Sequence, residues 1–238
     1  MPISTDPRPK VSPLRARLCR LARLDAATLT ALATAERDQR RWPARREMVG
    51  EGDLIKPRAI VSGWAFQQRI LGDGRRQIIN FLIPGDLIGV CAHRQPVESA
   101  SIVAVTEVVT CALPIAQAGT ELAEAYALSA ALEMHYLVQH SIRLGRLTAQ
   151  ERLIDWFLEI QGRLKLAGIV ASDQFTVPLT QELLADTLGL TNVHVNRTLQ
   201  VLRREGLLGA QGGTITLTDR AHLQSLVDHR PPRFVPKD

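Results

Sequence analysis

The run "TNVHVNRTLQVLRR", residues 191–204, contains side chains that can hydrogen-bond to the edges of nucleobases. Arginine can donate two hydrogen bonds to guanine, and asparagine can pair with the edge of adenine. Arg203 follows about two helical turns after Arg197, where a basic side chain could hold a phosphate. The chemistry indicated is recognition of double-stranded DNA by a set of closely spaced side chains: Asn192, His194, Asn196 and Arg197.

The residues around this run fit a helix-turn-helix motif, which needs a small residue where its helices cross and a glycine in the turn. Leu184 and Ala185 fill the crossing, and Gly189 takes the turn. Thr191 is suited to begin the second helix as its N-cap. That helix would bury Val195, Leu199 and Leu202, together with the core positions Leu188 and Leu190.

A winged helix is favoured over the alternative, an ordinary helical hairpin with a solvated face. The stretch "LLGAQGGTITLTD" after the motif reads as two short strands around Gly212-Gly213. The short strand "QFTVPLT" before the motif completes the winged-helix pattern.

The N-terminal half has the pattern of a β-barrel or sandwich between Arg45 and Leu113. Short β-branched or alternating runs are separated by "GEGD", "GDG" and "PGD". Asp73-Gly74 lies between two such runs and predicts a hairpin. Ahead of the barrel, residues 14–34 carry leucines at helical spacing, in which Leu18, Leu21, Leu29 and Leu32 could form one stripe.

Residues 120–147 predict one long helix that could join two copies of the chain. Its apolar positions follow the spacing of a coiled-coil seam, and this favours a homodimer over a single buried helix in a monomer. Thr148 and Glu151 form a capping box that starts the next helix, so the domain boundary is expected near 146–148. The predicted seam residues are Leu128, Ala131, His135, Val138 and Ile142.

Composition places few limits on function. The net charge of +5 is concentrated in residues 1–48 (+6), whereas residues 49–147 carry −1 and residues 148–238 carry 0, so DNA binding must rest on local charge. No apolar run approaches the roughly 20 residues that span a bilayer, and no secretory signal begins the chain. Three scattered cysteines fit a reducing cytoplasm.

The chain resembles the CRP/FNR family of bacterial transcription regulators, over about residues 18–228. The resemblance rests on "GEGD" (50–53), "SGWAFQQRILGDGRRQIINFLIPGDLIG" (62–89), "ALP" (112–114) and "LTQELLADTLGLTNVHVNRTLQVLRREGLL" (179–208). It implies an α+β fold in which an N-terminal antiparallel β-barrel, a cyclic-nucleotide-binding-like jelly roll, precedes a long dimerisation helix and a C-terminal winged helix-turn-helix.

The expected domain organisation follows from this fold. We predict a basic, disordered N-terminus (1–17), a sensor barrel (18–118), a dimerisation helix (119–147), a winged-helix DNA-binding domain (148–230) and a tail (231–238). The expected partners are double-stranded DNA, a second copy of the chain and RNA polymerase, with no membrane.

By resemblance, Arg197 matches the arginine with which the family contacts a half-site guanine. Four residues earlier, Val193 stands where family members often have glutamate, which implies a different half-site; valine can make only apolar contact, for example with a thymine methyl group. We expect phosphate contacts from Thr191 and Arg203. The predicted DNA-binding set is Thr180, Thr191, Asn192, Val193, His194, Asn196, Arg197 and Arg203.

The signal sensed by the barrel is not identified by the sequence. Cyclic AMP is not expected, because Glu98-Ser99 stands near the place of the family's Arg-Ser and a glutamate there would repel a phosphate; Arg94 could compensate only in principle. A four-cysteine iron–sulfur cluster is not expected either, because only Cys19 and Cys111 fall at family positions. Two alternatives stay open: a redox-responsive regulator using these two thiols, and a ligand-independent regulator controlled by its abundance.

An enzyme built on the barrel is not expected. Metal-dependent barrels need several histidine and carboxylate ligands, whereas His93 is the only histidine between Arg45 and Leu113. No nucleophile–base pair is apparent, and no metal site or axial haem ligand is predicted.

Overall fold

The computed structural model describes residues 11–90 and 97–233, and its N-terminal half contains the predicted antiparallel barrel. Two four-stranded sheets have the strand orders β1-β8-β3-β6 and β2-β7-β4-β5. Apolar side chains between them, among them Ile60, Leu82 and Ile102, are fully or almost fully buried. The strands are β1 (Gln39–Trp42), β2 (Glu47–Val49), β3 (Arg58–Ser62), β4 (Ala65–Ile70), β5 (Arg76–Leu82), β6 (Leu87–Ile88), β7 (Ser101–Ala104) and β8 (Val108–Ala112).

The hairpin predicted at Asp73-Gly74 joins β4 to β5. The amide of Gly74 donates to the carbonyl of Leu71, and the Asp73 carboxylate accepts the amide of Arg75 at 3.0 Å. Gly74 has a φ of 85°, a conformation that costs glycine little. The turn therefore sets the register in which Ile70 faces Arg76.

The N-terminal segment differs from the prediction of a disordered end over residues 1–17. Helix α1 (Pro13–Leu21) begins at Pro13, capped by Ser12, while residues 1–10 lie outside the described part of the chain. Leu14 and Leu18 are fully buried, so the apolar contact offsets the entropy of ordering this end. The leucine stripe of residues 14–34 is divided between α1 and α2 (Ala26–Ala35), because Asp25 caps a second helix.

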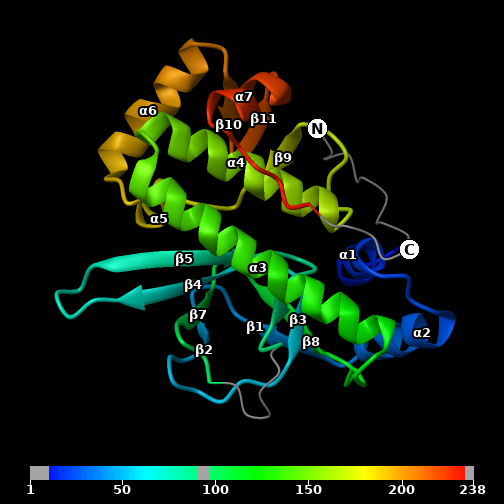
Figure 1. Ribbon diagram of the computed structural model, residues 1–238. Coiled ribbons are helices and arrows are strands. Elements are labelled where there is room, and N and C mark those ends of the chain that lie inside the picture. Colours follow the sequence, from blue (N-terminus) through cyan, green and yellow to red (C-terminus); the bar gives the residue numbers. More distant parts are fainter. Residues whose placement is uncertain (1–10, 91–96, 234–238) are drawn as a thin grey trace, which may run out of the picture.

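Two long helices cross the middle of the molecule (Figure 1). Helix α3 (Glu121–Arg146) confirms the predicted long helix, and α4 (Ala149–Leu166) begins at the predicted capping box of Thr148 and Glu151. The predicted buried face of α4, which includes Leu153 and Phe157, is buried. No helix in the described ranges combines the length and apolar character needed to cross a membrane.

The C-terminal half is the predicted winged helix. Strands β10 and β11 form a hairpin at Gly212-Gly213, and β9 pairs with the other edge of β11. These strands pack against the helices through buried side chains such as Phe175, Ile215 and Leu217. The elements are β9 (Gln174–Thr176), α5 (Gln181–Leu188), α6 (Asn192–Arg204), β10 (Leu208–Gln211), β11 (Thr214–Leu217) and α7 (Arg220–Leu226).

One apolar cluster runs from the barrel into the winged helix. Phe81 of β5 packs edge-on against Trp156 of α4, with ring centroids 5.6 Å apart, and Trp156 packs in the same way against Phe157. Phe157 in turn contacts Phe175 of β9. Aromatic pairs of this geometry add to the stability gained from burial. They therefore stabilise the packing of α4 against both β5 and β9.

A chain of buried charges crosses the same junction. Asp86, in the turn between β5 and β6, accepts hydrogen bonds from Arg17 of α1 and Arg163 of α4. Glu159 joins Arg163 to Arg143 of α3, at 3.3 and 2.7 Å. The ion pairs continue from Arg143 to Asp155, whose carboxylate also hydrogen-bonds with the imidazole of His229 at 2.6 Å. We call this connected set the junction network: Arg17, Asp86, Arg163, Glu159, Arg143, Asp155 and His229.

Candidate nucleic-acid interface

The helix pair α5–α6 has the local geometry that the sequence predicts. Leu184 and Ala185 are buried where the helices meet, and Gly189 ends α5 with φ 61° and ψ 39°. This left-handed conformation is disfavoured for residues with a β-carbon. The Thr191 hydroxyl accepts the amide of His194 at 3.2 Å and so caps α6.

Helix α6 is divided into a buried face and an exposed face. Val195, Leu199 and Leu202 pack into the core of the winged helix. Val193 is the most exposed large apolar side chain among the described residues of this half, with 79% of its surface accessible. The other exposed side chains near the N-terminal end of α6 are Asn192, His194, Asn196 and Arg197. In Figure 1, α6 lies at the outer edge of the molecule, away from the barrel.

Two of the other predicted DNA-binding residues have local partners in the chain. The Thr180 hydroxyl accepts the amide of Leu183 and caps α5. The Arg203 guanidinium donates to the carbonyl of Ala210 in β10, so it ties α6 to the wing. Arg203 is exposed, and a guanidinium group has five N–H donors, so Arg203 can also donate to a phosphate.

A contact between the barrel and α5 is absent from the sequence-based prediction. Arg76, at the start of β5, pairs with Asp186 and Glu182 of α5. The Gln77 amide donates to the carbonyl of Asp186 at 3.0 Å. No local signal could reveal these bonds, because their partners are more than 100 residues apart in sequence. They fix the helix-turn-helix against the β4–β5 hairpin.

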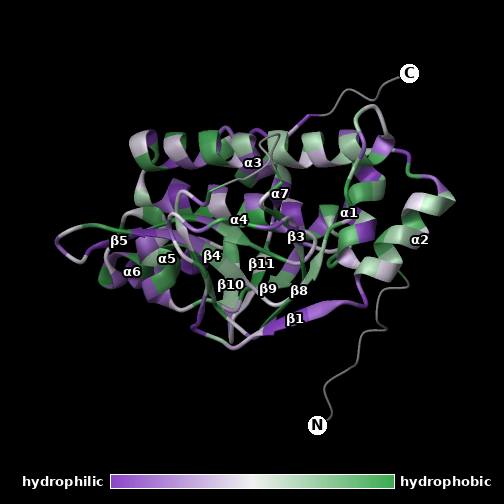
Figure 2. Cartoon of the chain, turned by 90° about the horizontal axis from the view of Figure 1, so that it is seen from below, coloured by the Kyte–Doolittle hydropathy of each residue, from purple (hydrophilic) through white to green (hydrophobic). Residues whose placement is uncertain are grey.

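The outward face of α3 carries only part of the predicted seam. Ala131, Val138 and Ile142 are exposed, whereas Leu128 and His135 are partly buried at its flank. The imidazole of His135 contacts the carbonyl of Arg230 in the same chain at 3.1 Å. Figure 2 shows α3 along one edge of the molecule. We call the exposed apolar positions the α3 face: Ala127, Ala130, Ala131, Met134, Leu137, Val138 and Ile142.

Among the described residues of the loop before β7, the position compared with the family's Arg-Ser carries a carboxylate, that of Glu98. Glu98 is partly buried and accepts a hydrogen bond from the side chain of Gln67 at 3.2 Å. Burial raises the pKa of Glu98, while the backbone amides of Ala100 and Ser99 act against this shift. The Glu98 carboxylate therefore accepts hydrogen bonds from these two backbone amides. Arg94 lies outside the described residues.

Glu133 is an acid of α3 that lies near the junction network. Burial, together with Asp86, raises the pKa of Glu133 to about 7 from 4.5, and Arg17 and Arg163 only partly oppose this shift. Between these two values the folded chain binds more protons at this site than the unfolded chain. The contribution of Glu133 to the free energy of unfolding is therefore lost as the pH rises from 4.5 to about 7.

Replacing Glu133 with glutamine should remove this pH dependence. The free energy of unfolding of the parent is expected to fall from pH 5 to pH 8 by an amount on the order of 3 kcal/mol more than that of Glu133→Gln. Urea denaturation at the two pH values measures the difference. Equal slopes for parent and variant would show that Glu133 titrates as an ordinary surface carboxyl group.

The described cysteines differ in their environment. Cys19 on α1 is exposed, and Cys111 in β8 is completely buried; both are free thiols. Burial, together with Glu36, raises the pKa of Cys111 to about 11, which keeps it protonated near neutral pH. Oxidation proceeds through the thiolate, so this environment disfavours the redox hypothesis for Cys111. Within 11–90 and 97–233, no group of three histidine, cysteine or acidic side chains is placed to hold a metal ion.

Two family profiles match separate halves of the chain. The profile of the cyclic nucleotide-binding domain matches residues 40–124, which include all the barrel strands except the first residue of β1. The profile of the Crp-like helix-turn-helix domain matches residues 151–226, from the first turn of α4 to the end of α7.

Curated proteins and solved structures are similar over both halves. The nitrogen fixation regulation protein FixK of Bradyrhizobium diazoefficiens is 34% identical over 174 residues, which cover 70% of this chain and 72% of FixK. The transcriptional activator FnrL of Cereibacter sphaeroides is 29% identical over 205 residues, covering 81% and 82% of the two chains. The structure of FixK2 from Bradyrhizobium japonicum has a TM-score of 0.68 at 27% identity and covers 79% of this chain and 96% of FixK2.

Proposed function

Because this chain belongs to the CRP/FNR family of bacterial transcription regulators, we propose that it reads a specific DNA sequence with the N-terminal end of α6. The observation that carries the proposal is the exposed polar face of this helix end, which is held by a cap at Thr191 and a buried apolar face. A helix-turn-helix inserts this end of its second helix into the major groove.

The side chains of this end have distinct proposed roles. Arg197 pairs with a guanine, and Asn192, His194 and Asn196 contact neighbouring base edges. Val193 offers only apolar contact, so we propose a half-site that differs from one read through a glutamate at this position. Thr180, Thr191 and Arg203 position the domain against the phosphates.

We propose that the regulator acts as a homodimer joined through the α3 face. Two copies related by a two-fold axis would present their α6 helices about one helical turn of DNA apart, ~34 Å, on a palindromic operator. The support is the run of exposed apolar side chains on α3, in which Met134 is 62% and Val138 48% accessible.

The barrel is the proposed sensor, and α3 and α4 are the elements that pass its state to the winged helix. The position of the Glu98 carboxylate supports a signal other than a cyclic nucleotide. A signal would shift the population between two dimer forms with different α6 orientations. We propose a non-catalytic role in the cytoplasm, with RNA polymerase as the protein partner.

Replacing Arg197 with alanine tests the proposed reading of DNA. A palindrome is first selected from a pool of randomised duplexes with the purified parent protein. The variant should then bind that operator more weakly by about 1–3 kcal/mol per half-site and lose its preference at one base pair of each half-site. Fluorescence anisotropy with single-base variants of the operator measures both changes.

Arg41→Ala is the matched control, because Arg41 is an exposed arginine on β1 of the barrel that pairs with Glu107. It should bind the operator as the parent does. An Arg197→Ala protein that keeps the affinity and base preference of the parent would show that α6 does not read the site through this residue.

A further inference from the structure

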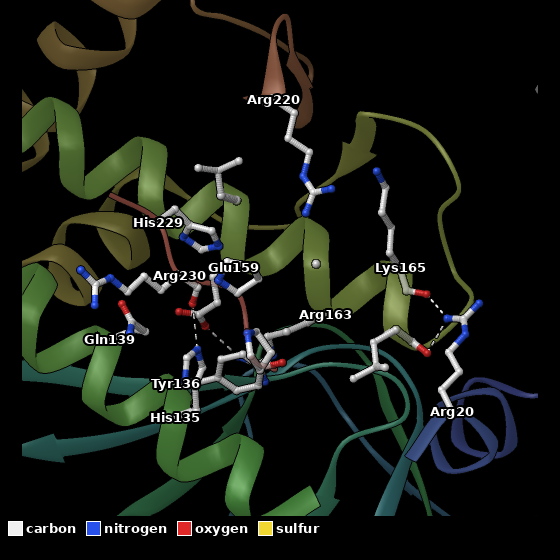
Figure 3. A pocket seen from close by; sticks show the side chains of 15 residues that line it. Arg20, His135, Tyr136, Gln139, Glu159, Arg163, Lys165, Arg220, His229 and Arg230 are labelled. Carbon is white, nitrogen blue, oxygen red and sulfur yellow. Dashed lines mark hydrogen bonds and ion pairs between the residues drawn. The ribbon is translucent and has the colours of Figure 1, made fainter. Parts of the chain in front are cut away.

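A pocket lies outside the barrel, where α1, α3, α4, α7 and the segment after α7 meet (Figure 3). Its volume is about 410 Å³, within the range of about 300–1,000 Å³ typical of small-molecule sites. No barrel strand contributes a side chain to it, so it is separate from the part of the fold that holds cyclic nucleotides in related domains.

The walls combine an apolar surface with unusually many cations. Tyr136, Leu158 and Pro231 provide apolar contact. Five arginine or lysine side chains also line the pocket, whereas Glu159 is the one carboxylate among the described lining residues, and it is already paired with Arg143 and Arg163. An anionic ligand is favoured by those lining cations that no carboxylate of the chain already pairs.

Three of these five cations are paired with carboxylates of the chain, which leaves Arg20 and Arg220. Arg20 donates to the carbonyls of Lys165 and Leu166 at the end of α4. Arg220 interacts with Asp173 through charge but forms no ion pair with it among the described residues, so it is the cation best suited to an anion. Arg163 is fully buried and paired with Asp86 and Glu159; Lys165 and Arg230 each have an aspartate within 3.0 Å. Arg220 points from α7 towards the pocket in Figure 3. Its Nε atom is buried and has no hydrogen-bond partner in the described part of the chain. An unpaired buried donor of this kind is unfavourable until a partner arrives.

We propose that this pocket binds a small organic anion with an aromatic or otherwise apolar body and a carboxylate or sulfonate group that accepts hydrogen bonds from Arg220. The lining comes from His135 and Tyr136 of α3, from Arg220 of α7 and from the segment around Pro231. The ligand would thus bridge the helix that follows the barrel and the end of the winged helix. That the ligand acts as an effector of DNA binding rests on the proposed function. That the pocket binds the ligand does not depend on it.

Gly162 offers a way to fill the pocket without disturbing the fold. It lies in the middle of α4 and lines the pocket, and a β-carbon added there would meet no other atom within 4 Å. Leucine also has a higher helix propensity than glycine. Gly162→Leu should therefore keep α4 intact while its side chain occupies the site.

Binding is tested with 8-anilinonaphthalene-1-sulfonate, an aromatic sulfonate whose fluorescence rises in apolar sites, titrated against the full chain. The parent is expected to bind it with one strong site per chain. Gly162→Leu should weaken that site at least tenfold, and Arg220→Gln about tenfold, through loss of a charge-assisted hydrogen bond. Ala31→Leu, which adds a similar side chain at an exposed position of α2, should bind as the parent does.

Neutral N-phenyl-1-naphthylamine, which lacks the sulfonate, should bind the parent at least tenfold more weakly than the sulfonate does. Unchanged sulfonate affinity in both Gly162→Leu and Arg220→Gln would overturn the proposal, as would equal affinity for the neutral compound. Thermal melting confirms that each variant is folded. A protein that takes up the sulfonate here but binds no operator would reject the proposed function and leave the pocket assignment standing.

Discussion

Replacing Arg163 with methionine is expected to lower the free energy of unfolding by about 3–5 kcal/mol, the cost of leaving buried charges without their partner. Only 1% of the Arg163 side chain is accessible. Its guanidinium donates to the carbonyl of Phe81 at 2.6 Å and to Asp86 at 2.7 Å, and it also contacts Asn80. Burial opposes its charge, but Asp86 and Glu159 outweigh this effect and raise the pKa of Arg163.

Urea denaturation of the parent and of Arg163→Met measures the loss of stability. Arg75→Met is the matched control, because Arg75 is 77% accessible and pairs only with Asp73 in the β4–β5 turn. Exposed ion pairs contribute about 0–1 kcal/mol, so the control should remain close to the parent. A loss below about 1 kcal/mol for Arg163→Met would show that the junction network does not hold α4 against the barrel.

The position of Arg163 links stability to the proposed signalling. It belongs to the first helix of the winged-helix half, yet its partners Phe81 and Asp86 belong to the barrel. Glu159 carries the connection onward to Arg143 at the end of α3. A change in the barrel that moved Asp86 would therefore act directly on the two helices that orient α6. The junction network is one contiguous set of contacts across this junction, beside the aromatic cluster from Phe81 to Phe175, and it is the set that contains Asp86.

The elements that sequence reasoning predicted are those whose signals are local. Thr148 and Glu151 cap a helix within four residues, Asp73-Gly74 closes a hairpin, and Gly189 and Thr191 define the turn before α6. Each signal depends on backbone geometry that neighbouring residues impose, so it can be read without knowing the fold. The exposed face of α6 follows from the helical period alone.

The junction network could not be predicted, because its members are far apart in sequence and individually ordinary. Arg17 and Asp86 are 69 residues apart, and Arg163 and Asp86 are 77 residues apart. Residues 1–17 were expected to be a basic, disordered end, and Arg17 is one of several basic residues there. Only the docking of α1 onto the barrel turns Arg17 into a buried partner of Asp86.

The α3 face shows the limit of a strict seven-residue pattern. The predicted seam included Leu128 and His135, but both are partly buried against the chain itself, and His135 contacts Arg230. The exposed apolar side chains include Met134 and Leu137, which the heptad choice omitted. A helix with apolar side chains on two sides can pack against two neighbours. Sequence spacing alone does not show which of these side chains contact which neighbour. The face proposed for dimerisation is therefore centred on Met134 and Val138.

Replacing Val138 with glutamate is expected to separate the proposed dimer, because the two-fold axis would bring the same substitution close to itself in both copies. Two unpaired carboxylates in an apolar interface should weaken association by at least about 3 kcal/mol, roughly a hundredfold. Sedimentation velocity should then show a 26.3 kDa monomer where the parent sediments as a dimer, and operator binding should fall with it. Ala31→Glu, at an exposed position of α2, should remain dimeric. A dimeric Val138→Glu protein would place the subunit contact elsewhere, since a charge is tolerated at the centre of the α3 face only if that face stays in water.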